Sequence, residues 1–308
     1  MKEYLLRVEE DNENERIDRY VAGVLADLSR SYIQKLIESG DLTVDGKNIK
    51  CGYKLKKGQE IRVVAPDSII PDILPEDIPL DILYEDDDIL VVNKPKGMVV
   101  HPAPGHYEHT LVNAVMYHCK GSLSGINGVM RPGIVHRIDK DTSGSVLICK
   151  NDESHACIAK QLEDHTIKRE YRAIVCGVID ADSGTIDRPI ARSVSDRKRM
   201  CVRPDGKRAV TNYEVIKRFN DFTYIKCILE TGRTHQIRVH MASIGHPVAG
   251  DEVYGNKTKT PVDTSGQALF AMTLGFFHPS DGHYVETVAP LPEYFEEFLN
   301  KCEKVVKK

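Results

Sequence analysis

The stretch GIVHRIDKDTSGSVLICK, residues 133–150, sets a run of charged and polar residues directly before an apolar segment. The apolar part, 145–150, has the length and composition of a buried strand. The polar part holds His136, Arg137, Asp139 and Asp141 within a few positions. Because active residues accumulate on loops that rigid strands hold in place, we expect a functional loop here.

Working outward, further apolar segments of strand length occur on both sides of this loop, and helical patterns are fewer. Helices are expected at 110–119, at 152–164 and near 292–303. Strands outnumber helices and do not alternate regularly with them, which favours a mixed, largely antiparallel α+β domain over 81–308 rather than a doubly wound fold. The expected strands include ILVVNK (89–94), YRAIVCG (171–177), TNYEVIKRF (211–219), YIKCILETG (224–232) and YVETVAP (284–290).

The N-terminal residues 1–66 are expected to form a separate small α+β module. Two short helical patterns occupy 16–37, a hairpin turn is predicted at Asp45-Gly46, and 59–64 is typical of a strand. The segment 67–80 that follows is rich in proline and acidic residues, which indicates an extended linker.

Composition excludes several classes of protein. The 308 residues are 41% hydrophobic, which supports a buried core, and there is no long apolar run or signal-peptide pattern, so we expect a soluble cytoplasmic protein. The eight cysteines form no CxxC pair and are expected to be reduced. The net charge of -4 hides two basic islands, Arg30–Arg62 and Arg188–Arg208, which suggest a polyanion touching two places.

A second polar cluster, TGRTHQIRVH at 231–240, carries more charge and hydrogen-bonding groups than solvent-exposed turns need. Its arginines and histidines could balance a buried carboxylate or grip phosphate. Both clusters also have simpler explanations. The first could be a capped turn, and the second could be the polar face of a helix or a strand.

Family resemblance distinguishes these readings. HRIDKDTSG (136–144) is similar to the HRLDxxTSG signature of the RluA-type pseudouridine synthases, and three further segments match in the same order. They are YEDDDILVVNKPKGMVVHP (84–102), TGRTHQIRVHMASIGHPVAGDEVYG (231–255) and QALFAMTLGFFHP (267–279), so the resemblance covers nearly all of 81–295. The segment SRSYIQKLIESGDLTVDGKNIK (29–50) resembles the S4 RNA-binding module.

The resemblance implies conversion of uridine to pseudouridine in large-subunit ribosomal RNA. That isomerisation needs no redox agent or group donor, so no cofactor is expected, and the histidine spacings predict no metal site. Asp139 would be the catalytic carboxylate, Arg238 the cation that keeps it ionised, and Tyr171 the residue that stacks on the uracil and helps to move a proton. Arg137 would fill the space that a flipped nucleotide leaves.

The remaining positions implied by the resemblance contact RNA. In the large domain they are His136, Arg233, Thr234, His235 and Gln236, and in the small module they are the phosphate contacts Arg30, Lys35, Lys47 and Lys50. Two other functions stay open from the residues alone. One is a catalytically silent RNA-binding or ribosome-assembly factor, and the other is a hydrolase or glycosidase that pairs Asp139 with Asp141. RNA is the expected partner, and we infer no membrane association and no obligate protein partner.

Overall fold

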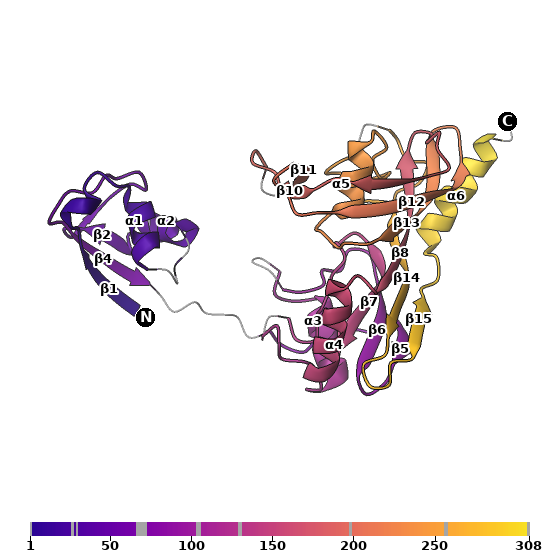
Figure 1. Ribbon diagram of the computed structural model, residues 1–308, viewed down its shortest axis with the longest axis horizontal. Helices are drawn as coiled ribbons and strands as arrows, with labels where there is room; N and C mark the ends of the chain where they lie inside the picture. Colours follow the sequence, from indigo (N-terminus) through magenta and orange to yellow (C-terminus); the bar gives the residue numbers. More distant parts are fainter. Residues whose placement is uncertain are drawn as a thin grey trace. The chain divides into compact units, whose positions relative to one another are not determined.

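The computed structural model describes residues 2–25, 28, 30–65, 73–102, 106–128, 131–196, 199–255 and 258–306. The chain divides into two compact units, Met1–Pro71 and Asp72–Lys308 (Figure 1). Within the described ranges, no helix is long and apolar enough to cross a membrane.

The first unit packs two helices on a four-stranded antiparallel sheet with the order β1-β4-β2-β3. The hairpin between β2 and β3 turns at Asp45 and Gly46, both with positive φ, as a tight hairpin turn requires. Strand β1 was not predicted, because its sequence mixes charged and apolar residues without clear alternation. The elements are β1 (Lys2–Arg7), η1 (Glu10–Asn12), α1 (Ile17–Val24), α2 (Arg30–Ser39), β2 (Leu42–Val44), β3 (Lys47–Asn48) and β4 (Glu60–Ala65).

The second unit is built on one nine-stranded sheet with helices packed against it (Figure 1). Its larger strands are β5 (Ile82–Glu85), β6 (Ile89–Lys94), β7 (Ser143–Cys149), β8 (Lys168–Cys176), β9 (Ser183–Asp187), β12 (Val210–Arg218), β13 (Phe222–Leu229), β14 (Leu269–Phe277) and β15 (Tyr284–Val288). A separate hairpin is formed by β10 (Ile190–Arg192) and β11 (Met200–Val202). The helices are α3 (Leu111–Cys119), α4 (Asp152–Glu163), α5 (Gln236–Ser243) and α6 (Glu293–Val306).

The order of the large sheet is β5-β6-β7-β14-β8-β13-β12-β9, with β15 paired to β14. All described pairs are antiparallel except β7 with β14, which run parallel only at Ser143–Phe270 and Gly144–Ala271. Beyond that contact β14 leaves β7 and pairs with β15 instead. The sheet therefore divides close to the start of β7, where the polar loop of residues 136–142 arrives.

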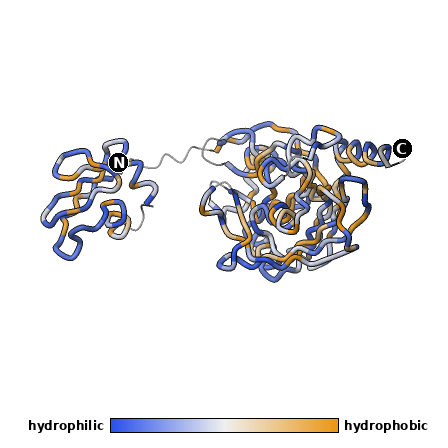
Figure 2. Tube along the Cα trace, turned by 90° about the horizontal axis from the view of Figure 1, so that it is seen from above, coloured by the Kyte–Doolittle hydropathy of each residue, from blue (hydrophilic) through white to orange (hydrophobic). Residues whose placement is uncertain are grey.

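The core lies at the centre of this sheet. All seven residues of β7 are buried, and Val146, Leu147 and Ile148 are completely so. At the usual value for burying an aliphatic side chain, these three contribute roughly 5 to 9 kcal/mol in total. Figure 2 shows the hydrophobic residues of this unit gathered toward its inside and the hydrophilic ones on its outside. Strand β7, which follows the polar loop, is thus a rigid support for it.

The predicted fold class, an α+β fold with a mixed, largely antiparallel sheet and a small N-terminal α+β module, is confirmed. Residues 73–80 of the predicted linker 67–80 lie in the described part of the chain and form no helix or strand. Ile73 is only 5% exposed and belongs to the core of the second unit, and the N–H of Glu76 donates to the Asn113 carbonyl at 3.0 Å. Ile73 and Leu80 contact the core and attach this segment to the second unit, whereas residues 66–72 lie outside the described residues.

Candidate active site

The loop that carries Asp139 enters β7 through a glycine that the sheet requires. Gly144 has a φ of +114°, and a Cβ at this position would overlap the backbone of Ala271 on β14. Only glycine allows β7 and β14 to approach so closely at this point. Before it, the N–H of Thr142 donates to the Asp139 carbonyl at 3.1 Å, which closes a turn. The loop therefore leaves the sheet in one defined direction.

Lys94, the last residue of β6, is hydrogen-bonded to the same loop. Its side chain is completely buried, and its Nζ donates to the carbonyls of Pro95, Met98 and Lys140 at 2.7, 2.8 and 3.0 Å. Burial lowers the pKa of Lys94 to about 7, although Asp141 and Asp139 act in the opposite direction. The sequence showed Lys94 only as part of a matching motif, and this positioning contact was not predicted.

The structure brings Asp139 and Arg238 together from positions far apart in the chain. The Nη1 of Arg238 donates to Asp139 Oδ2 at 2.8 Å, and the Asp139 side chain is 17% exposed. Arg238 lies on α5, which follows β13 by a short loop, and its side chain is 6% exposed. The carboxylate is thus fixed on one side and reachable on the other.

A second carboxylate, Asp251, holds the other edge of the same guanidinium. Its two oxygens accept from Arg238 Nε and Nη2 at 2.7 and 2.9 Å, and its side chain is completely buried. Burial disfavours the charge on Arg238, but the bonds to Asp251 and Asp139 outweigh it and raise the pKa of Arg238. The N–H groups of Val253 and Tyr254 donate to Asp251 Oδ1 at 2.9 and 3.0 Å. Sequence reasoning missed Asp251, although GDEVYG lay within a matching segment.

Tyr171 lies on β8 with only 9% of its surface exposed. Burial raises the pKa of its phenol to about 12, Arg169 acts to lower it, and the negative charge of Asp139 raises it further. Its hydroxyl is therefore protonated at neutral pH and can donate a hydrogen bond. To act as a base it must first become a phenolate, which a nearby cation would have to stabilise.

A hollow of about 50 Å³ is lined by Asp139, Tyr171 and Arg238. A larger cavity of about 520 Å³ shares part of this lining and lies within the size range of small-molecule sites. The residues common to both are Arg137, Tyr171, Leu229 and Arg233. Arg137 is exposed, and its Nη1 lies 3.2 Å from His101 Nε2. The Asp139 carboxylate, anchored by Arg238, therefore lies beside a cavity that Arg137 and Arg233 line.

The other predicted RNA-contact residues differ in whether their polar groups face the cavities or are hydrogen-bonded within the protein. His235 lines the hollow, with Nε2 at 3.8 Å from Asp139 Oδ1 and Nδ1 at 2.8 Å from Tyr254 Oη. Its φ of +56° is unusual for a residue with a side chain and turns the ring toward the carboxylate at the start of α5. Burial lowers its pKa, so the ring tends to be neutral. Thr234 is exposed and lines neither cavity.

Gln236 and His136 have polar groups that the protein itself uses. Gln236 is buried, its carbonyl accepts from Thr231 Oγ1 and Arg233 N, and its amide donates to Val210 and Thr211. His136 Nε2 accepts the N–H of Leu147 at 2.9 Å, and burial lowers its pKa to about 4. Both side chains hold the walls of the site in place.

In the first unit, Lys35, Lys47 and Lys50 are exposed, as phosphate contacts must be. Arg30 differs, because its guanidinium binds the buried carboxylate of Asp18 at 2.9 Å. Its side chain is 52% exposed, so one face is engaged in the fold and the other reaches solvent.

Comparisons with known proteins find matches over both units of the chain. Residues 88–243 match the model of the RNA pseudouridylate synthase family, and residues 15–61 match that of the S4 domain. The chain is 52% identical over 304 residues to an uncharacterized RNA pseudouridine synthase of Bacillus subtilis, with 99% of each chain covered. It is 48% identical to the ribosomal large subunit pseudouridine synthase D of Zymomonas mobilis, over 90% of each chain.

A solved structure shows the same fold. The human RNA pseudouridylate synthase domain containing 1 protein superimposes with a TM-score of 0.56 at 26% identity, covering 70% of this chain and 84% of that one. Because the family model matches more than half of the chain and the relatives cover nearly all of it, the chain belongs to the RNA pseudouridylate synthase family, with an S4 domain at residues 15–61.

Proposed function

We propose that this enzyme converts specific uridines of large-subunit ribosomal RNA to pseudouridine and that Asp139 is its catalytic carboxylate. The observation that carries the proposal is the Asp139 carboxylate, anchored by Arg238 at 2.8 Å in a hollow beside a larger cavity. The choice of RNA is supported by relatives from Zymomonas mobilis and Pasteurella multocida, which are named for the ribosomal large subunit. Ribosomal RNA as substrate also supports a location in the cytoplasm.

The reaction breaks the bond between N1 of uracil and C1' of ribose, turns the base and joins C5 to C1'. Breaking the bond leaves positive character at C1', which a carboxylate stabilises by charge or by a covalent bond. Asp139 has one oxygen held by Arg238 and is 17% exposed, so its other oxygen is available to the sugar. Arg238 fixes the orientation of the carboxylate and places a positive charge beside it.

The final step removes a proton from C5. Tyr171 lines the same hollow and offers a flat ring on which uracil can stack. Because its pKa is raised to about 12, its oxygen accepts that proton only as the phenolate, after the phenol proton has passed to solvent, and Arg169 is the cation whose charge favours the phenolate. Arg137 is exposed and lines both cavities, so it is suited to occupy the place of the extruded nucleotide.

A paired-carboxylate hydrolase receives no support from the lining of the two cavities. In the part of the chain that the structure describes, Asp139 faces the hollow, whereas Asp141 lines neither cavity and its side chain packs against Gly266. The two carboxylates therefore do not flank a common substrate space.

The test is tritium release from large-subunit ribosomal RNA labelled at C5 of uridine. Asp139→Asn should abolish release while RNA binding is kept, and Asp141→Asn should retain most of it as the matched control two positions along the loop. Retained release by Asp139→Asn would refute the assignment of the carboxylate. Free uracil in the wild-type reaction would instead indicate hydrolysis, and wild-type protein without release would favour a silent RNA-binding factor.

A further inference from the structure

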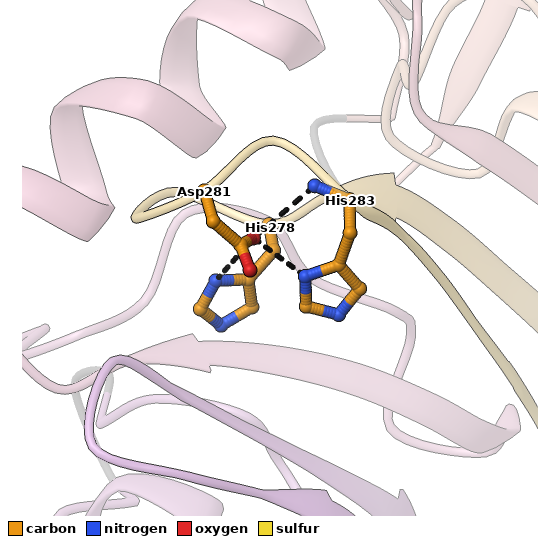
Figure 3. Close-up of side chains that lie close together, drawn as sticks. All are labelled: His278, Asp281 and His283. Atoms are coloured by element: carbon orange, nitrogen blue, oxygen red, sulfur yellow. Dashed lines mark hydrogen bonds and ion pairs between the residues drawn. The ribbon is translucent and has the colours of Figure 1, made fainter.

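The turn between β14 and β15 gathers three side chains that can bind a metal ion, His278, Asp281 and His283 (Figure 3). His278 directly follows β14 and His283 directly precedes β15, so the pairing of the two strands brings the histidines together. The Nδ1 of His283 lies 2.5 Å from Asp281 Oδ1, and the Nδ1 of His278 lies 3.7 Å from the same oxygen. One ligand atom from each residue lies within 4.8 Å of the others.

Hydrogen bonds prepare His278 as a ligand. Its Nε2 lies 2.7 Å from Asp86 Oδ2. Asp86 also accepts from the Tyr84 hydroxyl at 2.5 Å and from the N–H of Ile89 at 2.8 Å, which fixes its orientation. A carboxylate can only accept, so Nε2 of His278 carries the hydrogen and, in the neutral ring, Nδ1 carries the lone pair. A carboxylate behind the ring is the usual outer partner of a metal-binding histidine.

One of the three candidate ligands is buried and the other two are exposed. The His278 side chain is 6% exposed and is held by Asp86, whereas Asp281 and His283 are 64% and 53% exposed. The two rings face one another with centroids 5.0 Å apart and planes inclined by 17°. Ligand atoms around tetrahedral zinc lie roughly 3.3 Å from one another, a spacing that follows from its bond lengths. To reach this spacing, the exposed side chains of Asp281 and His283 must turn toward His278 Nδ1, which takes the two rings out of their stacked arrangement.

We propose that this turn binds one divalent transition-metal ion, represented by Zn²⁺, through His278 Nδ1, Asp281 Oδ1 and His283 Nδ1, with a water molecule as the fourth ligand. Nitrogen and carboxylate donors suit zinc and its neighbours rather than calcium or magnesium. On binding, the neutral His283 ring changes tautomer: Nδ1 gives up the hydrogen that it donates to Asp281, and Nε2 takes up a proton from solvent. The hydroxyl of Ser280, 2.8 Å from His278 Nδ1, is displaced by the ion.

The ion would act as a structural clamp. It would close the β14–β15 turn and, through Asp86, tie it to the turn between β5 and β6. None of the proposed catalytic steps uses these residues, so the site is independent of the isomerisation. The histidine spacings had predicted no metal, because H-x₂-D-x-H becomes a cluster only when the hairpin folds.

The test uses the full chain stripped of metal with a chelator and then titrated with Zn²⁺ against a chromophoric competitor. We expect one equivalent to bind, and His283→Ala and Asp281→Asn each to weaken binding at least about tenfold. Asp86→Asn, which changes the outer partner and keeps all three ligands, should weaken it by about 10- to 100-fold. The substitutions at 281 and 283 alter exposed side chains and should leave the fold and pseudouridine formation unchanged.

The matched control is His109→Asn. His109 Nδ1 lies 2.6 Å from Glu76 Oε2, a surface histidine–carboxylate pair outside the three-residue cluster. This variant should bind Zn²⁺ as the wild type does, and Zn²⁺ should raise the unfolding temperature of both but not that of His283→Ala. Equal affinities of the wild type and His283→Ala, or an equal loss in His109→Asn, would overturn the proposal.

Discussion

Replacing Asp251 by asparagine is expected to destabilise the second unit more than replacing Asp139 does, although Asp139 is the proposed catalytic residue. Asp251 is completely buried and binds Arg238 through two bonds, whereas Asp139 is 17% exposed and binds it through one. An asparagine at 251 would point an N–H donor at a guanidinium N–H or at the N–H groups of Val253 and Tyr254. Arg238 would then keep a buried charge with one partner.

Removing one partner of a buried ion pair costs about 3 to 5 kcal/mol. For a unit of this size that corresponds to a fall in unfolding temperature of roughly 6 to 20 °C. In Asp139→Asn the pair of Arg238 with Asp251 remains, and the loss of one charged hydrogen bond at a partly exposed position should cost about 1 to 2 kcal/mol.

Chemical denaturation and tritium release, measured on the same two variants, separate these effects. Asp139→Asn should lose only about 1 to 2 kcal/mol of stability and should be inactive. Asp251→Asn should be clearly less stable and, because Arg238 loses its orientation, should lose about 100-fold in kcat with a smaller change in KM. Equal stability of the two variants, or an Asp251→Asn enzyme with wild-type kcat, would show that Asp251 does not hold the arginine in place.

Three further predictions concern the walls of the site. Tyr171→Phe should retain stability and RNA binding but lose most turnover, and unchanged tritium release would show that the hydroxyl takes no part. Gln236→Ala should destabilise the protein by about 1 to 3 kcal/mol because it leaves buried groups unpaired, whereas the neighbouring Thr234→Ala, at an exposed position, should change urea stability by less than about 0.5 kcal/mol. His136 has its pKa lowered from 6.5 to about 4, so between these values the unfolded chain binds the proton and the folded chain does not. The free energy of unfolding should therefore fall as the pH drops from 6.5 to 4, and His136 should account for at most about 3 kcal/mol of this fall. The fall should be smaller in His136→Gln, and an equal dependence of stability on pH in both proteins would contradict the assignment.

Several residues of the candidate site could be named from the sequence because they lie in local motifs. Asp139 and Arg238 stand in two separate polar clusters, and family resemblance was enough to pair them across the chain. Asp251 was missed for a physical reason. A single carboxylate in a glycine-rich turn has no periodic pattern, and its partner becomes visible only when α5 packs beside the turn.

In the fold too, elements with a clear local pattern could be predicted, and features that depend on long-range packing could not. Strands with continuous apolar runs, such as β6 and β7, were predicted nearly to their ends, because burial on both faces leaves a clear composition. The segment 231–240 could be read as helix or strand, and α5 begins at Gln236 with six of its eight residues buried. A helix buried on most sides has no polar stripe, so its period is hidden. The parallel contact of β7 with β14 depends on long-range pairing that no local pattern encodes.

Mapping pseudouridines in large-subunit ribosomal RNA tests the central claim most directly. RNA would be compared from cells that lack the gene and from the same cells that express either the wild-type protein or Asp139→Asn. The account predicts that specific pseudouridines disappear without the gene, return with the wild-type protein and stay absent with Asp139→Asn. Return of those pseudouridines with Asp139→Asn, or no change when the gene is absent, would contradict it.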